Sequence, residues 1–139
     1  MKKYLIILLA VSFTFLGSIC CRAQEERLLL FSFVDGGGKT NEWFFPLSMR
    51  TKIPKWDPES GELPLSLTKA MKTSRKWVEN REHGTNFQLA SVCMCPVRPH
   101  EGFNQIFYYK FFYDMGNGQN HFVTVVLMNG SVLEPEILK

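Results

Sequence analysis

The sequence predicts an α+β domain in which one main helix packs on a curved antiparallel sheet of about four to five strands. Three observations support this fold class: an amphipathic helical pattern after Pro64, β-rich segments bounded by turn residues, and short connections that make neighbouring strands antiparallel. The chain has 139 residues, enough for one hydrophobic core and too few for two domains once a leader is removed.

The first 23 residues have the pattern of a signal peptide. Two lysines precede an apolar run from Tyr4 to Leu16, and smaller residues follow up to Ala23. The apolar run is shorter than the roughly 20 residues that a membrane span needs. We therefore expect cleavage before Gln24, no membrane span, a single domain over residues 24–139, and a secreted or periplasmic location.

A lipid anchor on Cys20 or Cys21 is the alternative to that cleavage. Ile19 precedes Cys20, and Cys20 itself precedes Cys21, so neither cysteine has the small preceding residue that lipoprotein processing prefers. The sequence therefore favours the cleaved, unanchored form.

The positive charge of the precursor comes from this leader. The chain has 16 basic and 13 acidic residues, and three of the basic residues precede residue 24. The remaining chain is near neutral, which gives no support to nucleic-acid binding, because that function requires a concentrated basic patch. No catalytic, metal or nucleotide motif is complete, so we expect neither a catalytic site nor a cofactor.

Residues 24–47 are expected to form a hairpin. Residues 27–34 are apolar and β-rich, residues 35–38 (DGGG) form a turn, and residues 39–45 return as a second strand. The segment DGGGKT is similar to part of a phosphate-binding loop, but Phe33 stands where that motif needs its first glycine, and no helix follows. A hairpin turn is therefore the favoured interpretation.

Three prolines between residues 48 and 64 predict an ordered surface connection, with Ile53, Trp56 and Leu63 contacting the core. The main helix is expected over residues 66–83, with Ser66 as its N-cap and Gly84 beyond its last turn. Residues of its expected apolar face recur at helical spacing: Leu67, Ala70, Met71, Ser74, Trp77 and Val78.

Residues 87–134 are expected to form an antiparallel meander. The predicted strands are residues 87–94, 105–113 and 121–128, followed by a tight turn at Asn129 and Gly130 and a short strand at residues 131–133. Glu134, Pro135 and Glu136 read as an acidic, solvated tail.

The aromatic run at residues 107–113 (FYYKFFY) is unusual, because a strand with one solvated face should alternate with polar residues. Either the hairpin covers the second face, which is the favoured interpretation, or the strand forms a binding surface. The residues of that candidate surface are Tyr108, Tyr109, Phe111 and Tyr113.

Cys93, Cys95 and His100 form the alternative candidate site, for a soft metal ion or for thiol chemistry. An extended segment would place both cysteines on one face, about 7 Å apart and too far for a relaxed disulfide. Three ligands without a recurrent zinc spacing are a weak pattern, so the sequence favours no metal.

The order of the helix that begins PLSLTKAMKTSRKW and the strands that end in HFVTVVLMNGSVLEPE resembles PepSY and cystatin-like exported domains. Ala70 and the segment from Asn129 to Leu133 lie where PepSY domains have a helix alanine and their last turn. The chain lacks the aspartate and Thr-Gly ending of that turn, and also the cystatin Gln-x-Val-x-Gly loop. The resemblance implies the fold and an extracytoplasmic regulatory or protease-restraining role.

Together these patterns predict a non-catalytic binding domain, with a protein or peptide as its partner. A structural subunit that presents a sheet edge to a partner strand is a further alternative.

Overall fold

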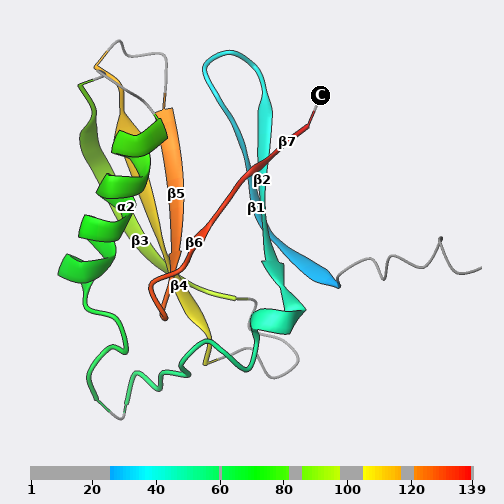
Figure 1. The fold of residues 1–139 in the computed structure, drawn as a ribbon, viewed down its shortest axis with the longest axis vertical. Coiled ribbons are helices and arrows are strands. Elements are labelled where there is room, and N and C mark those ends of the chain that lie inside the picture. Colours follow the sequence, from blue (N-terminus) through cyan, green and yellow to red (C-terminus); the bar gives the residue numbers. More distant parts are fainter. Residues whose placement is uncertain (1–25, 60, 82–85, 98–104, 117–120, 139) are drawn as a thin grey trace, which may run out of the picture.

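The structure is a computed structural model that describes residues 26–59, 61–81, 86–97, 105–116 and 121–138. Within these ranges it is α+β, with one α-helix and two antiparallel sheets (Figure 1). The elements in chain order are β1 (Arg27–Val34), β2 (Thr40–Pro46), the 3-10 helix η1 (Leu47–Met49), α2 (Leu67–Arg81), β3 (Gln88–Pro96), β4 (Phe107–Asp114), β5 (His121–Leu127), β6 (Val132–Leu133) and β7 (Glu136–Leu138). The expected signal peptide, with Cys20 and Cys21, lies outside the described residues.

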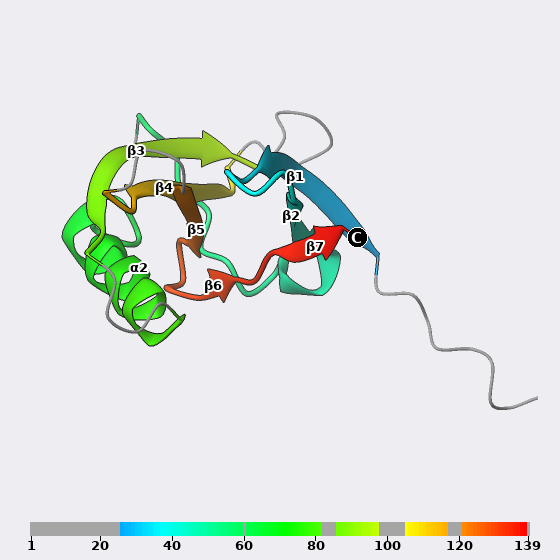
Figure 2. The ribbon, with the colours of Figure 1, turned by 90° about the horizontal axis from the view of Figure 1, so that it is seen from above.

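The strands form two sheets, so the expectation of a single sheet was wrong. One sheet has the order β1-β2-β7, and the other has the order β3-β4-β5-β6. Only Glu134 and Pro135 separate β6 from β7, so the end of the chain passes from one sheet to the other. Figure 2 shows three layers, with α2 on one side of the four-stranded sheet and the three-stranded sheet on the other. The inner strands β4 and β5 of the four-stranded sheet are therefore covered on both faces.

The N-terminal hairpin and its turn are confirmed. β1 pairs antiparallel with β2, and a carboxylate oxygen of Asp35 accepts hydrogen bonds from the backbone N–H groups of Gly37 and Lys39, each at 2.9 Å. The bond from Lys39 and then that from Gly37 hold the pKa of Asp35 below its usual value, although desolvation opposes them. Because this carboxylate occupies the N–H groups that would face a phosphate, the loop is a hairpin turn.

The connection between η1 and α2 is held onto the core. Ile53 is buried, and the Trp56 ring packs edge-on against Phe107 with centroids 5.1 Å apart. The Trp56 indole N–H donates to the carbonyl of Gly61 at 3.1 Å. The hydroxyl oxygen of Ser66 accepts a hydrogen bond from the N–H of Lys69 at 3.4 Å, which confirms the predicted cap.

The buried face of α2 is narrower than expected. Ala70, Ser74 and Val78 are its buried residues, whereas Leu67 and Met71 are 43% and 38% exposed. Small residues at every fourth position let the helix approach the sheet closely, and this leaves the larger side chains on its flank. The helix ends at Arg81, and residues 82–85, which include His83 and Gly84, lie outside the described residues.

The acidic segment near the C-terminus is part of the fold, so its assignment as a tail was wrong, although the Glu134 and Glu136 side chains are exposed as expected. Glu134 accepts a hydrogen bond from the Trp77 indole at 2.7 Å and forms an ion pair with Arg81. Glu136 begins β7, which pairs with β2, and forms an ion pair with Arg27. Sequence patterns missed β7 because its partner strand lies about 90 residues earlier in the chain.

Candidate functional site

The four residues of the candidate aromatic surface are buried. Tyr108, Tyr109, Phe111 and Tyr113 are between 0 and 4% exposed, so they form no accessible surface in the structure. The expectation of a binding surface at these residues was therefore wrong, because other elements cover both faces of β4. The hairpin covers one face, as the favoured interpretation held, and α2 covers the other (Figure 2).

Aromatic and cationic contacts join β4 to the hairpin. The rings of Phe33 and Phe112 pack edge to face with centroids 6.3 Å apart, and the Lys110 ammonium lies 4.6 Å from the centroid of the Phe31 ring. Lys110 is thus the polar exception in the aromatic run because its charge rests on the face of an aromatic ring. Burial, and then its neighbour Cys95, raises the pKa of Tyr108 on this same face.

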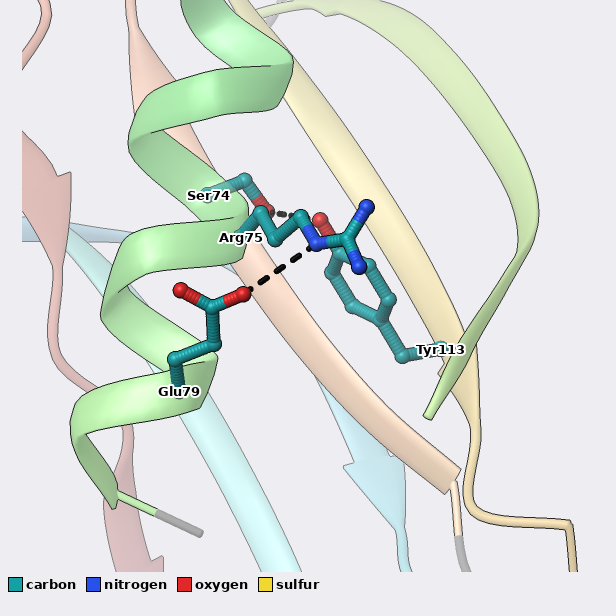
Figure 3. Close-up of polar contacts among 4 residues, drawn as sticks. All are labelled: Ser74, Arg75, Glu79 and Tyr113. Carbon is teal, nitrogen blue, oxygen red and sulfur yellow. Dashed lines mark hydrogen bonds and ion pairs between the residues drawn. The ribbon is translucent and has the colours of Figure 1, made fainter. Parts of the chain in front are cut away.

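Hydrogen bonds anchor the other face of β4 to the helix and its leading segment. The Tyr109 hydroxyl donates to the carbonyl of Leu65 at 2.9 Å. The hydroxyls of Ser74 and Tyr113 are hydrogen-bonded at 2.8 Å in a buried position (Figure 3). Desolvation raises the pKa of Tyr113, and the bond to Ser74 opposes that shift in part. These tyrosines are therefore structural.

The accessible apolar surface lies instead on β3, the strand at the edge of the four-stranded sheet. It pairs with β4 on one side and with no described strand on the other. Eight of its nine residues are exposed, and the segment QLASVCMCP carries no charge. Edge strands of soluble proteins are usually short, charged, or covered, because a free edge offers unpaired backbone groups to any other chain. β3 is none of these.

A β-bulge determines which face of the sheet each side chain of β3 points toward. The pairing register shifts between Leu89 and Ser91, so Ala90 has no partner on β4. As a result Leu89, Val92 and Met94 lie opposite residues of β4 that face α2, and they share that face. They are 39%, 37% and 41% exposed, and they form a continuous apolar stripe along the edge.

A groove lies between α2 and the Leu89 end of this stripe. It has a volume of about 500 Å³, and its lining is mainly apolar. Tyr113, held by Ser74, is part of that lining, and Phe87 packs edge-on against its ring with centroids 5.5 Å apart. Figure 3 shows the Arg75 side chain beside the Tyr113 ring, and an ion pair of 3.2 Å joins Arg75 to Glu79. The other lining residues are Met71, Lys72, Gln88 and Leu89.

A second pocket, of about 430 Å³, lies between the two sheets near the end of α2. Two of its charged groups have partners, since Asp35 holds its own turn and Arg81 is paired with Glu134. Trp43 also belongs to the lining, and its buried indole N–H has no hydrogen-bond partner among the described atoms. Lys39, Asn41 and His121 are further polar residues of this lining.

The cysteines of the alternative site lie where the sequence predicted. Cys93 and Cys95 are both free thiols and lie opposite Lys110 and Tyr108, on the face of β3 turned away from α2. His100 lies outside the described residues. Within the described part of the chain no three His, Cys, Asp or Glu side chains are grouped so that they could hold a metal ion.

Comparisons with protein-family models, with characterised proteins and with solved structures find no significant match to this chain. The resemblance to PepSY and cystatin-like domains therefore stays a prediction. None of the described helices has the length and the apolar character to cross a bilayer.

The candidate site is thus the β3 edge together with the groove beside α2. Sequence reasoning missed this site, although the signal was present in the predicted strand at residues 87–94, which has no charged residue. What could not be predicted is that β3 would be an outer strand, since strand order depends on contacts between distant segments.

Proposed function

We propose that this chain is an extracytoplasmic binding domain that takes up an extended segment of a protein or peptide partner as an additional strand beside β3. The observation that carries the proposal is the long, uncharged and exposed edge of β3. Every second residue of such an edge directs its N–H and C=O groups outward, so an added strand gains main-chain hydrogen bonds.

The length of β3 also supports the addition of a partner strand at this edge. Nine residues give an edge of about 30 Å at the usual rise per residue. The outer strands at other edges, β6 and β7, have two and three residues. β1 is comparably long, but Leu28, Leu30, Phe31 and Phe33 pack against the core. Of the edges that the structure describes, β3 therefore offers the longest accessible template.

The apolar stripe adds side-chain contacts to the backbone hydrogen bonds of the edge. Leu89, Val92 and Met94 share one face of the sheet, and Leu89 lines the groove. Alternate side chains of an added strand would lie beside them on the same face. Contact with these side chains removes apolar surface from water on both partners. The edge would then provide affinity, and the stripe would provide selectivity for apolar residues at every second position.

The experiment is selection of a displayed library of random nine-residue peptides on the purified protein. Enriched peptides should alternate apolar and polar residues, and they should lose binding to a double variant with Val92→Lys and Met94→Lys. Charges on an edge strand oppose pairing, yet both sites are exposed, so the fold should persist. Circular dichroism checks that folding.

The control is Val34→Lys, which introduces one lysine at an exposed valine of β1, as Val92→Lys does on β3. Its binding should equal that of the unaltered protein. Failure to enrich any extended peptide, or equal binding by the double variant, would contradict strand addition at β3.

The extracytoplasmic part of the proposal rests on the leader pattern of residues 1–23. Mass spectrometry of the protein from its native host should find a mature chain that begins at Gln24. An acylated N-terminal cysteine would mean that the domain is tethered to a membrane at Cys20 or Cys21, whereas an intact N-terminus would contradict export by cleavage.

A further inference from the structure

The charges beside the β3 edge restrict the chemistry of the segment that it binds. We infer that this segment is acidic at the end that lies next to Gln88 and apolar at alternate positions along the rest of β3. The inference rests on the strand addition proposed above, and it adds the sign and the position of the charge.

The first observation is the imbalance of charge on α2. The helix LTKAMKTSRKWVENR has five basic residues and one acidic residue. That acidic residue, Glu79, is already joined to Arg75 at 3.2 Å. Lys72 is exposed, and no acidic partner lies near it among the described residues. The helix therefore presents uncompensated positive charge.

The second observation is where this charge lies along the strand. Lys72 and Arg75 line the groove together with Phe87, Gln88 and Leu89, at the N-terminal end of β3. The Arg75 guanidinium lies 5.9 Å from the centroid of the Phe87 ring, which holds its side chain over this end. The apolar stripe continues through Val92 and Met94 toward the other end. The cationic and apolar parts of the site thus lie in sequence along the edge.

A second copy of this chain is a poorer occupant than an acidic segment. Pairing of two β3 strands would bring QLASVCMCP against itself, and this strand offers no carboxylate to Lys72. A partner strand with Glu or Asp near Gln88 would place opposite charges within reach across a groove with an apolar lining. Such complementarity contributes to specificity and to the choice of register.

The experiment compares two labelled nine-residue peptides by fluorescence anisotropy. Both alternate valine and threonine, and they differ only at the residue expected beside Gln88, which is glutamate in one and lysine in the other. The glutamate peptide should bind about fivefold more tightly at low salt, as expected for an exposed charge pair, and the difference should shrink at high salt.

Charge reversal tests whether Lys72 recognises the acidic residue of the peptide. Lys72→Glu should remove or reverse the preference, while Lys52→Glu, a matched reversal at an exposed lysine outside α2 and β3, should leave it unchanged. If both peptides bind equally to the unaltered protein and to Lys72→Glu, the acidic preference is wrong although strand addition stands.

Two other outcomes overturn the inference in different ways. If neither peptide binds, and no library peptide is enriched, then strand addition itself fails. If the protein forms a concentration-dependent dimer that Val92→Lys abolishes, the occupant of the edge is a second copy of the chain. Sedimentation velocity of the unaltered protein and of this variant distinguishes that case.

Discussion

The buried pair of Ser74 and Tyr113 allows a quantitative test of how α2 is held on the four-stranded sheet. Their hydroxyls are 2.8 Å apart, and both residues are at most 2% exposed. The same pair supports the wall of the groove, because Tyr113 lies within its lining. A double-mutant cycle of Ser74→Ala and Tyr113→Phe measures how much this hydrogen bond contributes to the free energy of unfolding.

The two single substitutions should differ in cost. Ser74→Ala leaves the Tyr113 hydroxyl buried without this partner, which should lower the free energy of unfolding by about 1.5 kcal/mol, after a small gain in helix propensity. Tyr113→Phe should lower it by about 1 kcal/mol, since the Ser74 hydroxyl can bond to a carbonyl of the preceding helical turn instead. The double variant should lose about 1.5 kcal/mol, which corresponds to a coupling of about 1 kcal/mol.

Urea denaturation followed by tryptophan fluorescence measures these differences. Thr68→Ala, at an exposed position of the same helix, controls for helix propensity and should not be destabilising. If the losses of the single variants add without coupling, the hydrogen bond does not stabilise the contact between α2 and β4, and the reasoning is wrong.

Three further predictions concern stability. Burial raises the pKa values of Tyr108, Tyr109 and Tyr113, so the unfolded chain loses these protons first. The contribution of the three tyrosines to the free energy of unfolding should be constant below about pH 10 and fall above it. Denaturation midpoints against pH, with tyrosinate absorbance, test this, and ordinary titration before unfolding would refute it. The Thr124 hydroxyl is buried without a partner among the described atoms, so Thr124→Val should raise the unfolding free energy by about 1 kcal/mol in calorimetry, and a loss would reveal a missed partner. Gly130 has a φ of 87° in open space, so Gly130→Ala should cost about 1 kcal/mol from backbone strain alone, measured by urea denaturation, and no cost would argue against this turn geometry.

The elements of this protein were largely predictable because their signals are local. The Asn129 and Gly130 turn follows from a residue pair, and Gly130 adopts the positive φ that the pair predicts. The start of α2 follows from Ser66 and the helical spacing behind it. The aromatic run forms β4 as expected. Each of these features depends on residues within a few positions along the chain.

The candidate site was not predictable in the same way. The apolar pattern of α2 gave no reason to separate Met71, which is exposed in the groove, from Ala70, which is buried. The tyrosines of β4 were named as a candidate surface because their cover comes from other segments: α2 and its leading segment cover Tyr109 and Tyr113, and the hairpin, about 75 positions earlier, covers the opposite face. Likewise, Glu134 was placed in a tail because its partners, Trp77 and Arg81, lie on the far side of the meander in sequence.

The sequence by itself determined the fold class, the hairpin, the helix and the strands of the meander, since backbone propensity, turn residues and periodicity act over short distances. Only the tertiary structure decided that the strands divide into two sheets, that both faces of β4 are covered, and that β3 is left with a free edge. The physical reason is that exposure depends on which distant segments pack together. The sequence of one strand does not specify which strand pairs with it.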